Sequence, residues 1–226
     1  LWEIKDNEKE IEDRFYKELE FGTAGLRGIM GAGTNRMNIY TVRKTAQGLA
    51  NHIKTKGEDA KRRGVVIAYD CRRMSREFSE ESAQVFAGNG IKAYLFKDLR
   101  STPELSFAIR YLNCISGVVV TASHNPPEYN GYKVYWEDGA QIATDRAKAI
   151  IDSIASIDSF ENIKIMDKEE AESKGLLTYL DEGIDDAYIE EVKKQSLRGE
   201  TIKKVTDDFR VVLTPLHGTG SMPVRR

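Results

Sequence analysis

The sequence has no run of apolar residues near the ~20 that a membrane-spanning helix requires, and its first residues, LWEIKDNEKEIEDRF, contain no apolar signal-peptide core. Only two of its 226 residues are cysteines, and neither Cys71 nor Cys114 belongs to a CxxC pair, so no disulfide framework is indicated. Charge of neither sign prevails, because 34 Lys and Arg residues face 36 Asp and Glu residues and leave a net charge of −2. We therefore expect a cytoplasmic protein whose partners include neither membranes nor nucleic acids.

Three motifs of common enzyme classes are also missing. The glycine-rich stretch GIMGAGTNR lacks the third glycine of the dinucleotide-binding GxGxxG motif, and no clear strand precedes it. The sequence contains no GxxxxGK[ST] loop and no serine within GxSxG, and HGTG alone is weak evidence for an oxyanion loop. These absences argue against a nicotinamide dehydrogenase, a P-loop phosphohydrolase and a serine hydrolase.

The pattern of apolar residues predicts strands that alternate with helices. Hydrophobic residues make up 40% of the chain, which is enough for a core. Short apolar runs predict buried strands at residues 64–70, 91–96, 117–121 and 132–136. Helical spacing and capping residues predict helices at residues 4–20, 38–57, 75–88, 102–113, 144–154 and 184–197, whereas 158–183 give no clear signal. The sequence therefore predicts an α/β fold with a mixed four-stranded sheet flanked by helices, in which the turn after residue 136 introduces an antiparallel pair.

The last residues predict the beginning of a second domain. Residues 198–208 are charged and resemble a linker, and Phe209–Pro215 (FRVVLTP) has the composition of a new strand. A lone strand followed by a glycine-rich loop cannot bury itself. We therefore expect one domain over residues 1–200 and the opening of a second α/β domain, which this chain does not complete, over residues 207–226.

The segment TASHNPP, residues 121–127, is the best candidate for a chemical site. It follows an apolar strand directly, and ligands in open α/β sheets bind where strands end. Ser123 is a candidate nucleophile with His124 beside it, and Pro126 and Pro127 restrict the backbone of the loop. An ordinary turn, in which Ser123 and Asn125 bond their own backbone, fits the same residues.

Five segments in order resemble the α-D-phosphohexomutases, the family of phosphoglucomutase and phosphomannomutase. TASHNPPEYNGYK resembles the family's active-site serine loop. The others are FGTAGLRG (residues 21–28), YDCRR (69–73), STP (101–103) and TPLHGTG (214–220). Together they extend over almost the whole chain, and the bacterial branch that includes phosphopentomutase-like members is the most similar.

The resemblance implies that Ser123 is phosphorylated and passes its phosphoryl group to a sugar monophosphate. A bisphosphate intermediate then turns around and returns its other phosphate to Ser123. Arg27 would supply positive charge to the phosphate, Lys133 would transfer a proton, and His124 would assist with positioning or protons. By the same resemblance Thr23, Gly25, Arg27 and Lys133 contact the substrate; solvated surface charge is the alternative role for the two cations.

The residues around these motifs receive secondary roles. An aspartate at a strand end can brace an arginine or a turn, so Asp70, Arg72 and Arg73 are expected to support the site. His217 is expected either to shape an interdomain cleft or to pack, and His52, within a helix, is expected to have no catalytic role.

The family's Mg²⁺ site requires an acidic DGDxDR-type loop, and this sequence has none. The phosphate on Ser123 would be one ligand, and we expect the carboxylate ligands beyond Arg226. The nearest acidic cluster, residues 181–186, lies at a helix start, where acids favour the helix dipole. We therefore expect this chain alone to be inactive.

The resemblance leaves several questions open. It predicts a mutase that acts on sugar phosphates. Glucose is the expected sugar, mannose and a pentose are the alternatives, and a sugar bisphosphate is the expected activator. A non-catalytic sugar-phosphate-binding module is the alternative from another class. The oligomeric state is undetermined.

Overall fold

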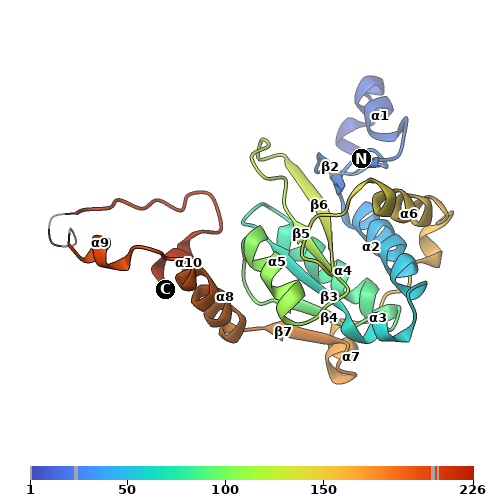
Figure 1. Ribbon diagram of the computed structural model, residues 1–226. Coiled ribbons are helices and arrows are strands. Elements are labelled where there is room, and N and C mark those ends of the chain that lie inside the picture. The colour runs from blue at the N-terminus through green and yellow to red at the C-terminus, as the bar shows by residue number, and fades with distance from the viewer. Residues whose placement is uncertain (1, 23–24, 205–206, 208) are drawn as a thin grey trace.

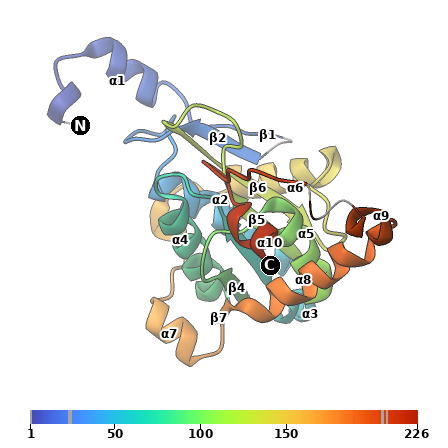
Figure 2. The same ribbon diagram turned by 90° about the vertical axis from the view of Figure 1, so that its left-hand side faces the viewer.

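The protein folds around one mixed β-sheet with helices on both faces (Figures 1 and 2). The computed structural model describes residues 2–22, 25–204, 207 and 209–226. Within these residues the sheet has seven strands in the order β1-β2-β6-β5-β3-β4-β7. The strands are β1 Phe21–Gly22, β2 Gly25–Ile29, β3 Val65–Tyr69, β4 Ala93–Phe96, β5 Ser116–Val120, β6 Tyr129–Trp136 and β7 Leu177–Leu180.

The helices connect and cover these strands. They are α1 Glu8–Phe15, α2 Ile39–Lys54, α3 Glu58–Arg63, α4 Ser75–Gly88, α5 Thr102–Tyr111, α6 Thr144–Ala155, α7 Lys168–Ser173, α8 Glu182–Lys194, α9 Gly199–Lys203 and α10 Ser221–Arg225, with short 3₁₀ turns η1 Trp2–Ile4 and η2 Phe160–Asn162. Side chains of α2, α4 and α6 form the core on one face of the sheet. Those of α5 and α8 form a smaller core on the other face. None of the helices of the described residues is long and apolar enough to cross a bilayer.

The strands β3, β4 and β5 form the parallel centre, and both of their faces are buried. Each of the five residues in β3 and in β5 is buried, as expected for strands covered by helices on both sides. β6 runs antiparallel to β5 and to β2, so the prediction of a mixed sheet is confirmed. The four predicted strands all exist, with ends shifted by a few residues.

The predicted number of strands was wrong, because three further strands extend the sheet. β1 and β2 lie in the glycine-rich segment, which showed no apolar run, and β2 exists because it pairs along the edge of β6. β7 is four residues long and pairs with the outer edge of β4. In each case the strand forms because a neighbouring strand supplies hydrogen-bond partners, and the local sequence contains no signal for this pairing.

Helix boundaries follow from capping. The Asn38 side chain accepts the backbone N–H groups of Tyr40 and Thr41, and the Thr41 hydroxyl bonds back to the Asn38 backbone, which fixes the start of α2. Ser101 caps α5, and Pro103 occupies its first turn. The long helix predicted over residues 4–20 is instead η1 and the short α1, none of whose described side chains is buried.

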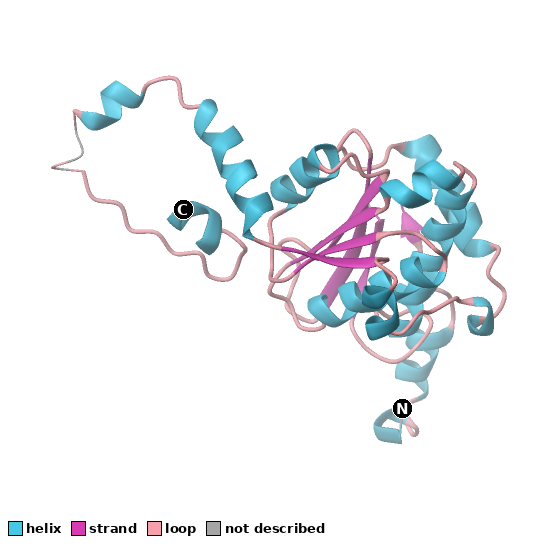
Figure 3. Ribbon diagram, turned by 90° about the horizontal axis from the view of Figure 1, so that it is seen from below, coloured by secondary structure: helices cyan, strands magenta, loops and turns pink. Residues whose placement is uncertain are grey.

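The predicted strand at Phe209–Pro215 is not formed. Residues 209–215 have no regular secondary structure. Their apolar side chains are largely in solvent, with Val212 96% exposed. Figure 3 shows this segment and α9 projecting away from the sheet. A strand requires a partner edge, and the described residues offer none here.

Candidate active site

The serine loop, residues 121–128, connects β5 to β6 at the carboxyl end of the parallel strands. β5 and β6 are paired up to Val120 and Tyr132. The Thr121 N–H donates to the Gly131 carbonyl at 3.0 Å, which closes the base of the loop. Asp70 follows β3, the neighbour of β5, and its N–H donates to the Val120 carbonyl at 3.2 Å. The loop therefore stands on the rigid centre of the sheet.

Ser123 is exposed at the tip of this loop, in an unusual backbone conformation. Its φ is 56°, in the left-handed region that non-glycine residues adopt at some cost. Its N–H donates to the Thr121 hydroxyl at 2.9 Å, and that hydroxyl donates to Asp70 Oδ2 at 2.5 Å. His124 Nδ1 lies 3.5 Å from Ser123 Oγ, at the limit of a hydrogen bond. The Ser123 hydroxyl is thus exposed to solvent, and hydrogen bonds through Thr121 to Asp70 hold the backbone that carries it.

Asp70 and Arg72 hold the loop from the β3 side, as the sequence suggested for support residues. Asp70 Oδ1 accepts hydrogen bonds from the Arg72 N–H at 3.0 Å and from the Ser75 hydroxyl at 2.8 Å. Arg72 directs its guanidinium into the loop and donates to main-chain carbonyls there, including that of Ser123 at 2.9 Å. Arg73 contributes its carbonyl, which accepts from the Asn130 amide at 3.0 Å, while its side chain is exposed.

Arg27 and Lys133 come from neighbouring strands and lie on the same face of the sheet. In the β2–β6 register Arg27 is opposite Gly131, and Lys133 is two residues further along β6. Lys133 is also opposite Val119, whose side chain belongs to the core on the α5 face. Both cations therefore project toward the α5 face.

Of these two cations, Arg27 makes a hydrogen bond to the described residues of the serine loop and Lys133 makes none. Arg27 Nη1 donates to Asn125 Oδ1 at 3.1 Å. No hydrogen bond joins Arg27 or Lys133 to Ser123 within the part of the chain that the structure describes. Sequence reasoning missed Asn125 and Thr121 as contacts of the site. The only feature of the sequence that could have pointed to them is that they are polar residues just after a buried strand.

Gly25, the first residue of β2, lies close to the backbone of β6. Its φ is +93°, and an added Cβ would overlap the Tyr132 carbonyl oxygen and lie 3.0 Å from the Lys133 Cα. A side chain at this position would therefore push β2 away from the strand that carries Lys133. Thr23, the other predicted substrate contact in this segment, lies outside the described residues.

The described residues hold no group of three or more His, Cys, Asp or Glu side chains arranged to bind a metal ion. Asp70, which supports the serine loop, already uses both carboxylate oxygens in bonds to protein groups. In the cluster 181–186, Asp181 caps α8, and Asp185 and Asp186 pair with arginines, so these acids are structural. Among the residues that the structure describes, these carboxylates therefore form no metal site.

Within the described residues, no hydrogen bond joins His217 or His52 to Ser123. The His217 carbonyl accepts from the Cys71 thiol at 3.2 Å, beside a cavity that Leu99 and Leu216 help to line. His52 is buried in α2 with its ring 5.4 Å from that of Trp136, and burial lowers its pKa. His52 therefore packs in the core.

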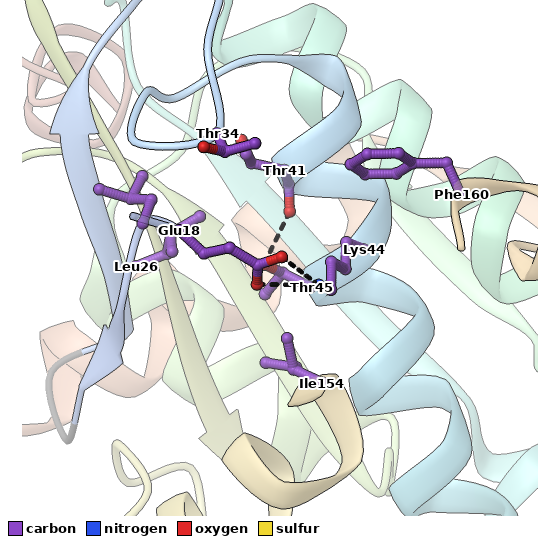
Figure 4. A pocket seen from close by; sticks show the side chains of 9 residues that line it. Glu18, Leu26, Thr34, Thr41, Lys44, Thr45, Ile154 and Phe160 are labelled. Atoms are coloured by element: carbon purple, nitrogen blue, oxygen red, sulfur yellow. Dashed lines mark hydrogen bonds and ion pairs between the residues drawn. The ribbon is translucent and has the colours of Figure 1, made fainter. Parts of the chain in front are cut away.

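A separate pocket lies on the other side of β2, between the N-terminal segment and α2 (Figure 4). Leu26 lines it, and successive strand residues point to opposite faces, so it is on the face opposite Arg27. Inside it Lys44 Nζ donates to both carboxylate oxygens of Glu18 at 2.8 Å. None of the described candidate catalytic residues lines this pocket.

Comparisons with known proteins agree with this architecture. The family model described as "Phosphoglucomutase/phosphomannomutase, alpha/beta/alpha domain I" matches residues 18–161. A phosphoglucomutase of Staphylococcus saprophyticus is 42% identical over 217 residues, which are 96% of this chain and 38% of that protein. A phosphopentomutase of Homo sapiens is 36% identical, over 95% of this chain and 36% of its own length.

A solved structure shows the same fold. The open form of pp63/parafusin, a phosphoglucomutase from Paramecium, superposes with a TM-score of 0.70 at 20% identity, over 93% of this chain and 41% of that one. The chain thus spans little more than a third of the length of the curated relatives it matches.

Proposed function

The chain belongs to the phosphoglucomutase/phosphomannomutase family, and from this we propose that it is the phosphoryl-carrying domain of a mutase that interconverts sugar 1-phosphate and sugar 6-phosphate. The observation that carries the proposal is Ser123, exposed at the end of a central strand with its backbone held on both sides. We propose glucose as the sugar, because identity is 42% to a phosphoglucomutase and 36% to a phosphopentomutase.

The proposed reaction moves one phosphoryl group twice. A hydroxyl of the sugar monophosphate attacks the phosphorus on Ser123, loses its proton to a base, and the bond from phosphorus to Ser123 Oγ breaks. The resulting sugar bisphosphate turns around, and the deprotonated Ser123 oxygen attacks its other phosphorus. The bond from that phosphorus to the sugar oxygen breaks, and the sugar oxygen takes back the proton that the base accepted in the first step. Because such a transfer needs in-line positioning and stabilised negative charge more than covalent assistance, a rigid loop is the main requirement.

Three side chains are proposed to serve this transfer. Arg27 has most of its guanidinium free, since one bond to Asn125 is its only hydrogen bond to the described residues, and the fork suits a phosphate. Lys133, half-buried on the same face, is the proposed proton-transfer group. His124 is proposed to steady the serine oxygen, which its ring faces at 3.5 Å. Gly25 and Thr23 are proposed to border the substrate.

Mg²⁺ and a sugar bisphosphate are the proposed cofactor and activator. When bound, Mg²⁺ would neutralise charge on the transferring phosphate. The described residues offer no cluster of acids for it, so we propose that the Ser123 phosphate is one ligand and that the carboxylates lie beyond Arg226. The bisphosphate would phosphorylate Ser123 before the first turnover.

We also propose that residues 1–200 form the first domain and residues 207–226 begin a second. The exposed apolar residues Phe209, Val211 and Val212 support this, because they would form the first strand of a sheet with residues further along the chain. The two cysteines are unpaired, which supports a reducing compartment such as the cytoplasm.

The test uses the full-length protein, its Ser123→Ala variant and Ser196→Ala as a control at an exposed serine. Each is incubated with a hexose bisphosphate that carries labelled phosphate, and the label is mapped by mass spectrometry. We expect label on Ser123 in wild type and control, and turnover of the Ser123→Ala variant at background. Label on another residue would contradict the assignment. Label on Ser123 without turnover of any sugar phosphate would indicate a binding module.

A further inference from the structure

Arg72 makes an unusual set of contacts with the serine loop. Its Nη1 donates to the carbonyls of Pro126 at 2.9 Å and Tyr129 at 3.0 Å. Its Nη2 donates to the carbonyls of Ser123 at 2.9 Å and Asn125 at 2.5 Å. One side chain therefore binds four main-chain oxygens in seven consecutive residues, from a position 51 to 57 residues earlier in the chain.

These contacts occupy both Nη groups of the guanidinium. Each Nη donates to two carbonyls, so no Nη donor remains for a substrate, and Nε lies 3.5 Å from Asp70 Oδ2 as an ion pair. The Arg72 side chain is 13% exposed, which places it beneath the loop. Arg27 has the opposite character, since it is exposed and makes one side-chain hydrogen bond to the described residues. The two arginines therefore have different tasks.

The loop needs such a partner because of its own sequence. Pro126 and Pro127 have no N–H, so the loop has few donors with which to pair its own carbonyls. At Ser123 the support is two-sided: the N–H bonds to the Thr121 hydroxyl, and the carbonyl bonds to Arg72. This holds a residue whose φ of 56° would otherwise be disfavoured.

We propose that Arg72 is a positioning residue for the phosphoryl transfer proposed above: it fixes the backbone of residues 123–129 through their carbonyls and thereby sets the place of Ser123 Oγ. It acts through the loop and does not touch the sugar phosphate. The inference rests on the proposed function for its kinetic part, whereas the bracing of the loop is independent of any reaction.

Arg72→Lys is the main variant, because it keeps the positive charge and removes the planar fork. A lysine has three donors on one nitrogen and cannot reach four carbonyls arranged around a guanidinium. Since a displacement of about 1 Å can lower a rate about 100-fold, we expect kcat to fall about 10- to 100-fold with KM nearly unchanged. Arg72→Gln, which loses both fork and charge, is the second variant and should have the larger effect.

Full-length wild type, both variants and the control Arg62→Lys, at an exposed arginine of α3, are compared in two measurements. Hydrogen exchange with mass spectrometry follows peptides that cover residues 117–130, and steady-state kinetics separate kcat from KM. Thermal unfolding identifies any variant that has lost its fold. We expect faster exchange confined to the loop and a lower kcat in both Arg72 variants, and neither change in the control.

Three results would overturn the inference. They are loop exchange like that of the control, an unchanged kcat, or a raised KM with unchanged kcat, which would make Arg72 a substrate contact. If Ser123 of the wild type is never phosphorylated, the proposed function fails by itself, and unchanged exchange in the Arg72 variants would still refute the brace separately.

Discussion

Replacing Glu104 by glutamine is expected to change how the stability of this domain depends on pH. Glu104 on α5 is completely buried, and Asp185 and Arg100 are 1% and 8% exposed. Arg100 donates to both carboxylate oxygens of Asp185, at 2.7 and 2.9 Å, and its Nε lies 3.7 Å from Glu104 Oε1. Neither carboxyl oxygen of Glu104 has a hydrogen-bond partner among the described residues. Arg100 is therefore the shared partner of two buried acids. It makes two hydrogen bonds to Asp185 but only a longer ion-pair contact with Glu104.

Burial, together with the neighbouring Asp185 carboxylate, raises the pKa of Glu104 from 4.5 to about 8, although Arg100 opposes the rise. Between these two pH values the folded chain keeps a proton that the unfolded chain releases. The contribution of Glu104 to stability is therefore complete below about pH 4.5 and is lost as the pH rises to about 8. The free energy of unfolding should fall by up to ~1.4 kcal/mol per pH unit in this window.

Asp185 does not mask this effect. Burial alone would raise its pKa, but the hydrogen bonds from Arg100 outweigh burial and hold the pKa below its ordinary value of 3.8. Stability from Asp185 is thus present above that value and is lost only at more acidic pH, outside the window of Glu104.

The assay is urea unfolding of the 226-residue chain between pH 5 and 9 at constant ionic strength. Glutamine cannot titrate, so the stability of Glu104→Gln relative to wild type should increase by up to ~1.4 kcal/mol per unit from pH 5 to 8 and then level off. Glu172→Gln on the exposed side of α7 is the control and should show no such trend. A difference between Glu104→Gln and wild type that is equal at pH 5 and pH 8 would refute the reasoning.

Three further predictions concern the site and its scaffold. The 226-residue chain alone should show no mutase turnover above background in a coupled assay, because its described residues contain no group of acids that could hold a metal ion; turnover like that of the full-length protein would contradict this. In the full-length protein Arg27→Ala should lower kcat by ~10- to 100-fold, while mass spectrometry still finds the label on Ser123; loss of the label would mean that Arg27 is needed to phosphorylate Ser123. Gly25→Ala should destabilise the chain by more than about 2 kcal/mol in urea unfolding, because its Cβ would overlap the Tyr132 carbonyl. Gly175→Ala, with φ of +67° but no atom within 4 Å, should cost only about 1 kcal/mol, and equal losses for the two would rule out the overlap as the cause.

The central strands could be predicted because their signal is local. β3 and β5 are covered by helices on both sides, so they consist of continuous apolar residues bounded by polar ones. The helices α2 and α4 likewise have apolar residues at helical spacing, and Asn38 marks the start of α2. Burial and capping determine these features, and both can be recognised from the residues of the segment itself.

The edges of the sheet could not be predicted in this way. β2 is rich in glycine and β7 is only four residues long, and both exist because β6 and β4 offer free edges. Phe209–Pro215 has the composition of a strand and forms none, because the described residues give it no edge to pair with. Strand formation at an edge depends on a partner, and a partner is a property of the tertiary structure.

The candidate site divides in the same way. The sequence by itself determined that Ser123 follows a buried strand in a loop restricted by prolines, and that the chain resembles the phosphohexomutases. Only the tertiary structure decided which charged residues hold that loop and which remain free: Arg72 binds four of its carbonyls, whereas Arg27 is left exposed beside Asn125. The sequence cannot distinguish two arginines in similar motifs, because the number of donors that each has left depends on backbone oxygens that come close only when β3, β5 and β6 are paired.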